Sequence, residues 1–250
     1  MSNPTSFTEA TSVFERYRPK NFPYQYRVGL VIGTLAGGTP TDPKVAEGWL
    51  RSKWRDKDDL IREAVAETMT ERGLTEEEAT EAVNAMKNLN GFKREEGKGL
   101  FIEGRQVKAM LKEAASIAVS SGNIKGRGWG TTNKGLKSFV AEHAFVTDDR
   151  VFIQQYDESG NLVAVKEPTG IMQRFVSTWK GTGIQYEEFV QDAYVTFTIE
   201  ADHEFTEQEW SAMLLTAERN GLGASRSQGY GKFKTVQFDR LDPKTGRIVG

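Results

Sequence analysis

The chain has 250 residues, an ordinary apolar fraction of 38% and a formal net charge of -2, which exclude wholesale disorder and permit one large domain. Cysteine is absent, which excludes a disulfide framework and a thiolate metal site. Only two histidines are present, so no histidine-rich metal site is predicted, and the lack of an apolar leader or bilayer-length apolar run favours a cytoplasmic protein.

The first 41 residues predict an arm followed by a buried strand. Residues 1–23 are polar and contain three of the seven prolines, which favours an N-terminal arm that is at most partly ordered. Residues 24–35 (YQYRVGLVIGTL) are rich in β-branched and aromatic side chains, which predicts a buried strand. Gly37 and Gly38 then predict a turn.

Residues 42–98 change in character and predict an acidic helical insertion. Apolar residues recur there at helical spacing, and Gly73 ends the first helix. Thr75 and Glu78 have the spacing of a capping box, which predicts the start of a second helix. The acidic residues are spread around these helices, so we interpret them as a solvated face rather than a metal site.

The middle of the chain predicts a helix followed by strands. Residues 100–119 read as a short strand or turn and then a helix with an apolar stripe. A long glycine-containing loop follows. Residues 136–146 and 150–157 predict strands, residues 158–161 a turn, and residues 162–168 another short strand. Residues 193–201 alternate strictly between apolar and polar and predict a further strand.

The last part of the chain predicts a helix, a loop and a closing strand. Residues 205–221 form an amphipathic pattern in which Thr206 and Glu209 are a capping box. Gly221 stands where a left-handed residue ends a helix. A glycine-rich loop leads to a strand over residues 232–241, and residues 242–250 predict a turn-like tail that frays.

The order of predicted elements indicates the fold class. Without the insertion and a long excursion before residue 193, it is β-α-β-β-α-β, typical of an α+β, ferredoxin-like (RRM-type) core. That core would comprise residues 24–41 and 99–241, interrupted by the helical insertion at 42–98. The fold supports many functions, so the site residues must carry the functional argument.

Several chemistries are disfavoured by motif spacing. The interval from Gly223 to Gly229 does not match a Walker loop, and no nucleotide cofactor is predicted. A serine nucleophile elbow is absent, as is cysteine. His143 falls in a predicted strand and His203 just before a helix start. Neither histidine has a partner visible in the sequence, so structural or surface roles are favoured, and no metal site is predicted.

Basic residues in glycine-containing loops with aromatics are the main functional signal. Glycines let a backbone approach phosphate closely, cations supply charge, and aromatic faces stack unpaired bases. Two such loops predict a single-stranded nucleic-acid binder. The alternative is that both are mobile surface loops whose aromatics pack inward. The candidate binding residues are Arg105, Lys108, Lys112, Lys125, Arg127, Trp129, Lys134, Gly221, Gly223, Arg226, Ser227, Gly229, Tyr230, Gly231 and Lys232.

Two segments resemble the RAMP superfamily, the RNA-binding proteins of CRISPR systems. Residues 220–233 (NGLGASRSQGYGKF) are similar to its C-terminal glycine-rich signature between the last helix and strand. The matching positions are Gly221, Gly223, Arg226, Ser227, Gly229, Gly231 and Phe233. Residues 100–115 resemble the start of the first helix in backbone subunits of CRISPR effector complexes, through Gly104, Lys108 and Leu111, with Arg105 replacing a small polar residue. The resemblance is absent over 42–98 and weak over 138–192.

This resemblance implies a ferredoxin-like core that binds single-stranded RNA along a groove and multimerises along the strand. The expected partners are single-stranded RNA or DNA, further copies of the chain and other subunits of a complex, with no cofactor and no membrane. A phage protein that coats single-stranded DNA and a scaffold that binds only protein remain alternatives.

Catalysis divides the family that the chain resembles. Its processing endoribonucleases use a histidine from the region of the first core helix, and residues 103–119 contain none. Some backbone subunits cut target RNA with an aspartate in the loop after the first strand. Asp42 occupies that region, although its neighbours match poorly. We therefore favour no catalysis over an endoribonuclease, and Asp42 is the one catalytic candidate.

Overall fold

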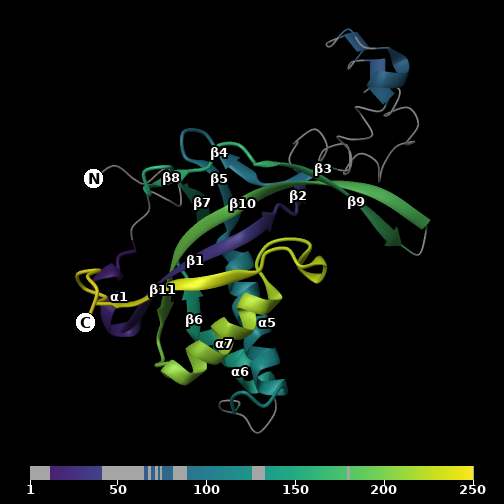
Figure 1. Ribbon diagram of the computed structural model, residues 1–250. Coiled ribbons are helices and arrows are strands. Elements are labelled where there is room, and N and C mark those ends of the chain that lie inside the picture. The colour runs from purple at the N-terminus through teal and green to yellow at the C-terminus, as the bar shows by residue number, and fades with distance from the viewer. Residues whose placement is uncertain are drawn as a thin grey trace.

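The computed structural model describes residues 12–40, 65–66, 69–70, 73, 75–80, 89–125, 133–178 and 181–249. Over these ranges the chain is α+β, with a large, mainly antiparallel sheet and a group of helices on one side of it (Figure 1). None of the helices within the described ranges combines the length and apolarity that crossing a lipid bilayer requires.

The sheet is organised around β1 (Tyr24–Ala36). This strand pairs antiparallel with β10 (Gly181–Ala201) on one side and with β11 (Phe233–Leu241) on the other. The sheet continues from β10 through β7 (Arg150–Tyr156) and β5 (Gly99–Glu103) to β4 (Lys93–Glu95). The strand predicted at residues 24–35 is confirmed, and its fully buried apolar side chains are those of Val28, Leu30, Ile32 and Leu35.

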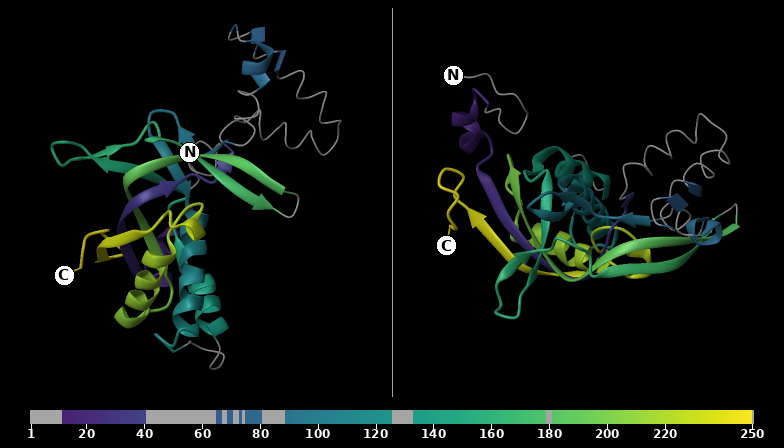
Figure 2. Two further views of the ribbon diagram at one scale, coloured as in Figure 1. Left: turned by 45° about the vertical axis from the view of Figure 1, so that its right-hand side comes forward. Right: turned by 90° about the horizontal axis from the view of Figure 1, so that it is seen from above.

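Shorter strands extend the sheet at its margins. They are β2 (Thr39–Pro40), β3 (Leu89–Gly91), β6 (Ala144–Val146), β8 (Leu162–Ala164) and β9 (Gly170–Thr178). Strand β9 pairs with the first half of β10, and this hairpin projects away from the rest of the sheet (Figure 2). The strand predicted at residues 193–201 is therefore only the second half of a 21-residue strand.

Three helices lie together on one side of the sheet: α5 (Gly104–Ser120), α6 (Asn133–His143) and α7 (Glu207–Asn220) (Figure 1). The apolar stripes of α5 and α7 pack with β1 and β10 in one core, which confirms both predicted helices. Burial of these stripes stabilises the fold by about 25 cal/mol for each Å² removed from water. At the N-terminus, the chain forms short helices η1 (Glu15–Tyr17) and α1 (Arg18–Asn21).

Both predicted capping boxes are present. At the start of α7, the Glu209 N–H donates to Thr206 Oγ1 at 3.2 Å and the Thr206 N–H donates to Glu209 Oε2 at 2.7 Å. Thr75 and Glu78 make the equivalent pair of bonds ahead of a helical segment at 76–80. Gly221 ends α7 with a positive φ of 80°, although its ψ of 170° is extended rather than left-handed helical.

The prediction of a strand over residues 136–146 was wrong. The chain continues as α6 to His143, and only the last three of these residues form β6. Leu136 and Val140 are both fully buried and lie four residues apart, which is the spacing of a helix face. The sequence analysis identified the segment as apolar, but it assigned the two-residue period of a strand where the buried residues follow the period of a helix.

Two short strands lie within the segment predicted as a helical insertion. Residues 89–95, assigned to it from the sequence, contain β3 and β4, which pair with β10 and β5 respectively. These strands are three residues long, too short to show a period of two in the sequence. The segment predicted as a helical insertion thus contains two strands near its end, and most of its predicted helical part lies outside the described residues.

Both ends of the chain are tied to the sheet where the structure describes them. Arg18 donates three hydrogen bonds to the carboxylate of Glu200, at 2.8, 3.0 and 3.1 Å. The C-terminal tail folds back on β11, because the Val249 N–H donates to the Arg240 carbonyl at 2.8 Å. The tail thus forms a small hairpin through residue 249, which corrects the prediction that it frays.

Candidate nucleic-acid interface

The glycine-rich loop, residues 221–232, is docked on the end of β1. The Gly231 N–H donates to the Thr34 carbonyl at 2.8 Å, and the Ala224 N–H donates to the Ala36 carbonyl at 3.1 Å. Such bonds satisfy backbone groups that would otherwise lack partners. The loop therefore extends the hydrogen bonding at the end of β1.

Its four glycines adopt conformations that other residues avoid. Gly221, Gly223, Gly229 and Gly231 have φ values of 80°, 89°, 93° and 74°. A Cβ atom on Gly231 would also lie 1.9 Å from the carbonyl oxygen of Leu222, while one on Gly229 would meet nothing within 4 Å. At position 231, both the positive φ and the lack of space for a Cβ atom require glycine. At position 229, only the positive φ does.

Two side-chain contacts fix the tip of the loop. Ser225 donates its hydroxyl hydrogen to Glu187 Oε2 at 2.6 Å, and Glu187 lies on β10 with 1% of its surface exposed. Arg226, the first residue of the short helix η2 (Arg226–Gln228), donates to Glu113 Oε2 of α5 at 2.6 Å. The Arg226 pair is partly exposed, and exposed ion pairs contribute only about 0–1 kcal/mol, so a phosphate can compete for the guanidinium.

The rest of the loop faces solvent and a groove. Ser227 and Gly229 are exposed, and Tyr230 is half-buried. Lys232 is exposed and lines a groove of about 1260 Å³ between α7, the end of α5 and strands β1 and β11. Arg219 and Lys234 line the same groove, which adds two cations that lie outside the predicted set.

The predicted cations of α5 have different surroundings. Arg105 is exposed and donates to Glu103 Oε2 at 2.6 Å. Lys112 is half-buried and lies seven residues further along α5, which places it on the same side of the helix as Arg105. Lys125 is exposed, five residues after the end of α5. These three side chains are available at the surface.

Lys108 is turned toward the protein instead. Its Nζ donates to the Val140 carbonyl at 2.7 Å and to the Ala144 carbonyl, at the end of α6. Burial lowers the pKa of Lys108 from 10.5 to about 8, with a smaller contribution from the charge of Lys112. The side chain therefore caps one carbonyl of α6 and the first carbonyl of β6, and its role in nucleic-acid binding stays a prediction.

Four other predicted residues have side chains that the structure does not describe. Asp42, Arg127 and Trp129 lie outside the described part of the chain. Lys134 lies in α6, but its side chain is likewise outside the description. The second glycine-containing loop and the one catalytic candidate therefore remain expectations from the sequence.

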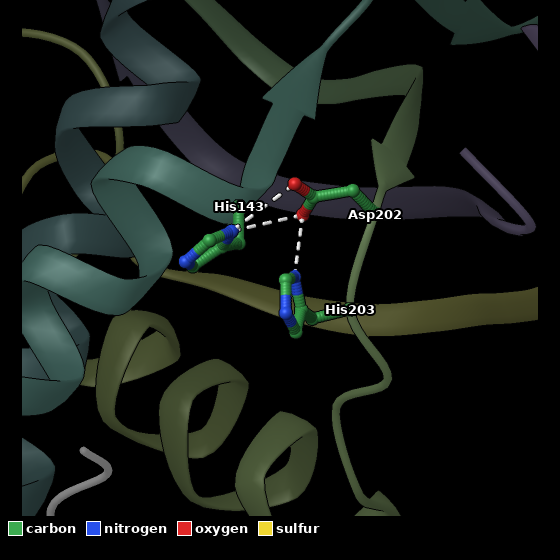
Figure 3. A group of neighbouring side chains, drawn as sticks. All are labelled: His143, Asp202 and His203. Atoms are coloured by element: carbon green, nitrogen blue, oxygen red, sulfur yellow. Dashed lines mark hydrogen bonds and ion pairs between the residues drawn. The ribbon is translucent and has the colours of Figure 1, made fainter. Parts of the chain in front are cut away.

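One cluster was missed by the sequence reasoning. His143, at the end of α6, and His203, after β10, meet at the carboxylate of Asp202 (Figure 3). The only signal in the sequence was that Asp202 and His203 are adjacent. His143 was placed in a strand, so its approach to this pair was not expected.

No protein-family model matches this sequence, and no curated protein matches it. Among solved structures, the chain is similar to one described as "Cryo-EM structure of the Type III-B Cmr-beta bound to cognate target RNA", with a TM-score of 0.44 and 10% sequence identity. The match covers 91% of this chain and 63% of the other, so this chain spans less than two thirds of that one's length.

Proposed function

We propose that this protein binds single-stranded RNA without sequence preference and multimerises along the strand as a backbone subunit of a CRISPR-type ribonucleoprotein. The RAMP-like signature of residues 220–233 motivates the proposal. The geometry of the glycine-rich loop, which contains that signature, is the observation that carries it.

The strand order supports a ferredoxin-like core as part of this proposal. The core would consist of β1, α5, β7, β10, α7 and β11 in chain order. Their order across the sheet is β11-β1-β10-β7, with every neighbouring pair antiparallel. This corresponds to order 4-1-3-2 for a β-α-β-β-α-β unit, in which β1 and β7 run parallel with β10 between them.

The glycine-rich loop supports binding because it is rigid at its base and exposed at its tip. Backbone bonds to Thr34 and Ala36 hold the base, and the Ser225–Glu187 bond fixes the approach to η2. Ser227, Gln228 and Gly229 then lie exposed. A preorganised surface loses little conformational entropy when it binds a strand, which favours affinity.

Cations of the loop and of α5 suit contact with a phosphate backbone. Arg226 lies against α5, where Arg105 and Lys112 share one side of the helix. A separation of seven residues in a helix corresponds to about 10.5 Å, so these two cations can contact different phosphates. Charge of this kind supports binding that depends on the strand and not on its sequence.

The proposal is tested by fluorescence anisotropy with a labelled oligouridylate at low salt. The double variant Arg226→Ala/Lys232→Ala is expected to weaken binding by about tenfold or more, because each phosphate contact adds favourable counterion release. Lys244→Ala is a matched control, because Lys244 is an exposed cation in the C-terminal hairpin, remote from the loop in sequence. It should bind as the unaltered chain does.

Two results would contradict the proposal. One is an RNA affinity in the double variant equal to that of the Lys244→Ala control. The other is tighter binding to duplex than to single-stranded RNA. The same titration with oligodeoxythymidylate shows whether the strand is RNA, as proposed, or DNA.

A further inference from the structure

The pairing of β6 with β10 brings two distant parts of the chain into register. Ala144 is paired with Ala201 at the end of this antiparallel ladder. His143 immediately precedes Ala144, and Asp202 immediately follows Ala201, so these two residues face each other just beyond the last pair. His203 is the next residue along, and it reaches the same carboxylate (Figure 3).

The three side chains share one small space. His143 Nδ1 lies 3.0 Å from Asp202 Oδ1 and 3.2 Å from Oδ2. His203 Nδ1 lies 3.1 Å from Asp202 Oδ1. The two imidazole rings have centroids 4.2 Å apart, and one potential ligand atom from each of the three residues lies within 4.8 Å of the others.

We propose that His143, Asp202 and His203 form a binding site for one divalent transition-metal ion, with Zn²⁺ as the best fit. Imidazole nitrogens and a carboxylate oxygen are ligands that Zn²⁺ takes in proteins. Two ligands held about 2.0–2.1 Å from a tetrahedral Zn²⁺ lie about 3.3 Å apart. The observed nitrogen–oxygen distances are already close to this value.

Metal binding requires only that the hydrogens on the two Nδ1 atoms are displaced, so that each imidazole is protonated on Nε2. In the metal-free arrangement, an Nδ1 hydrogen of either ring can donate to Asp202. The ion takes the place of these hydrogens, and each neutral ring then carries its hydrogen on Nε2. An aspartate carboxylate is ionised at neutral pH, so Asp202 offers oxygen ligands to the ion.

The surroundings suit three protein ligands and an open fourth position. The side chains of His143, Asp202 and His203 are 24%, 32% and 55% exposed, which leaves one side accessible to water. On another side, the ring of Phe139 packs 4.4 Å from the His143 ring and 5.6 Å from the His203 ring, measured between centroids. Phe205 packs behind Phe139, so an aromatic wall limits the movement of both imidazoles.

The direct test is calorimetric titration of Zn²⁺ into the full chain after removal of bound metal with a chelator. We expect one saturable equivalent in the unaltered chain. His203→Ala should weaken this binding by at least about tenfold, the smallest loss typical even for groups that only support a metal ligand. His203 is more than half exposed, so its removal leaves the core intact.

Glu204→Gln is the matched control, because Glu204 is the neighbouring exposed acid and lies 3.9 Å from Arg240 rather than in the cluster. Its Zn²⁺ affinity should equal that of the unaltered chain. Loss of binding in Glu204→Gln equal to that in His203→Ala would overturn the assignment of ligands. So would the absence of any saturable binding to the unaltered chain.

A spectroscopic measurement provides a second readout. His143 and His203 are the only two histidines, so their imidazole nitrogen resonances are simple to assign by removing one at a time. Zn²⁺ should shift the Nδ1 resonances of both rings together. Zn²⁺ binding that persists at full strength in His143→Ala/His203→Ala would place the ion elsewhere and overturn the proposal.

Discussion

Ser225 of the glycine-rich loop donates a hydrogen bond of 2.6 Å to Glu187, a carboxylate that is 1% exposed on β10. The loop and the root of the β9–β10 hairpin are therefore joined by a buried polar contact. Glu187 has further interactions besides this bond. A buried carboxylate that lacks hydrogen-bond donors destabilises the folded protein. Moving the loop away from the hairpin would remove one donor from Glu187, so the positions of the loop and the hairpin depend on each other.

Removing the Ser225 hydroxyl tests that link. Ser225→Ala is expected to lower the free energy of unfolding by about 1–3 kcal/mol, because it takes a donor from a buried charged acceptor. Chemical denaturation followed by tryptophan fluorescence measures the change. Ser227→Ala is the matched control, because Ser227 is exposed two residues away and should change stability by less than about 0.5 kcal/mol. Equal effects of the two variants would show that the Glu187 contact is not stabilising.

The glycines of the loop should differ in their tolerance of alanine. Gly229→Ala places a Cβ in open space at a positive φ, which costs about 1–3 kcal/mol. Gly231→Ala has the same unfavourable φ and also brings its Cβ 1.9 Å from the Leu222 carbonyl oxygen. We expect it to lose at least about 1–3 kcal/mol more, measured as the difference in unfolding free energy between the variants. The reverse order of stability would contradict the described loop geometry.

Lys108 should give the protein a dependence of stability on alkaline pH. Its pKa is lowered by burial to about 8 in the folded chain, against 10.5 for an exposed lysine. Between these values the unfolded chain binds more protons, so stability increases with pH through this window and is lost as pH falls toward 8. Unfolding free energies of the unaltered chain and Lys108→Gln should therefore diverge in favour of the unaltered chain from pH 8 to 10. A constant difference over this range would show that the pKa of Lys108 is not lowered.

The proposed contacts to RNA should appear in the salt dependence of binding. For each phosphate contact removed, the slope of log affinity against log salt concentration should become shallower by about 0.7–0.9. Arg226→Ala and Lys232→Ala should each reduce the slope by about one contact, and the double variant by about two. Anisotropy titrations at several salt concentrations measure these slopes. An unchanged slope in both single variants would remove these side chains from the interface.

Multimerisation along the strand makes a separate prediction. The mass of the complex, measured by light scattering, should increase in steps as oligouridylates of increasing length are added. Each step should equal one protein chain, because every copy occupies a similar length of strand. A complex that contains one chain at every RNA length would contradict the proposed backbone role while leaving RNA binding itself intact.

The sequence predicted best those features that depend on neighbouring residues. The capping box of Thr206 and Glu209 was visible because its members lie three residues apart, and the same is true of Thr75 and Glu78. The glycines of the final loop indicated positive φ, since few other residues tolerate it. These local patterns predicted α7, the loop and β11 in the correct order along the chain.

Features that depend on tertiary pairing were harder to predict. The β9–β10 hairpin was missed because its sequence lacks a clear alternation, and its pairing supplies the regularity instead. Lys108 looked like a phosphate ligand by position, but its direction depends on where α6 ends. The meeting of His143 and Asp202 depends on the register of β6 against β10, which no local pattern encodes.

Strand β10 has one further consequence. Glu187, about a third of the way along it, contacts the glycine-rich loop, and Asp202 directly follows its last residue. Fifteen residues separate these two positions, a contour of about 50 Å at the rise of a strand. The proposed RNA interface and the proposed metal site thus contact opposite ends of one continuous segment of chain. A change in backbone position at one end can therefore be passed to the other end along the strand itself.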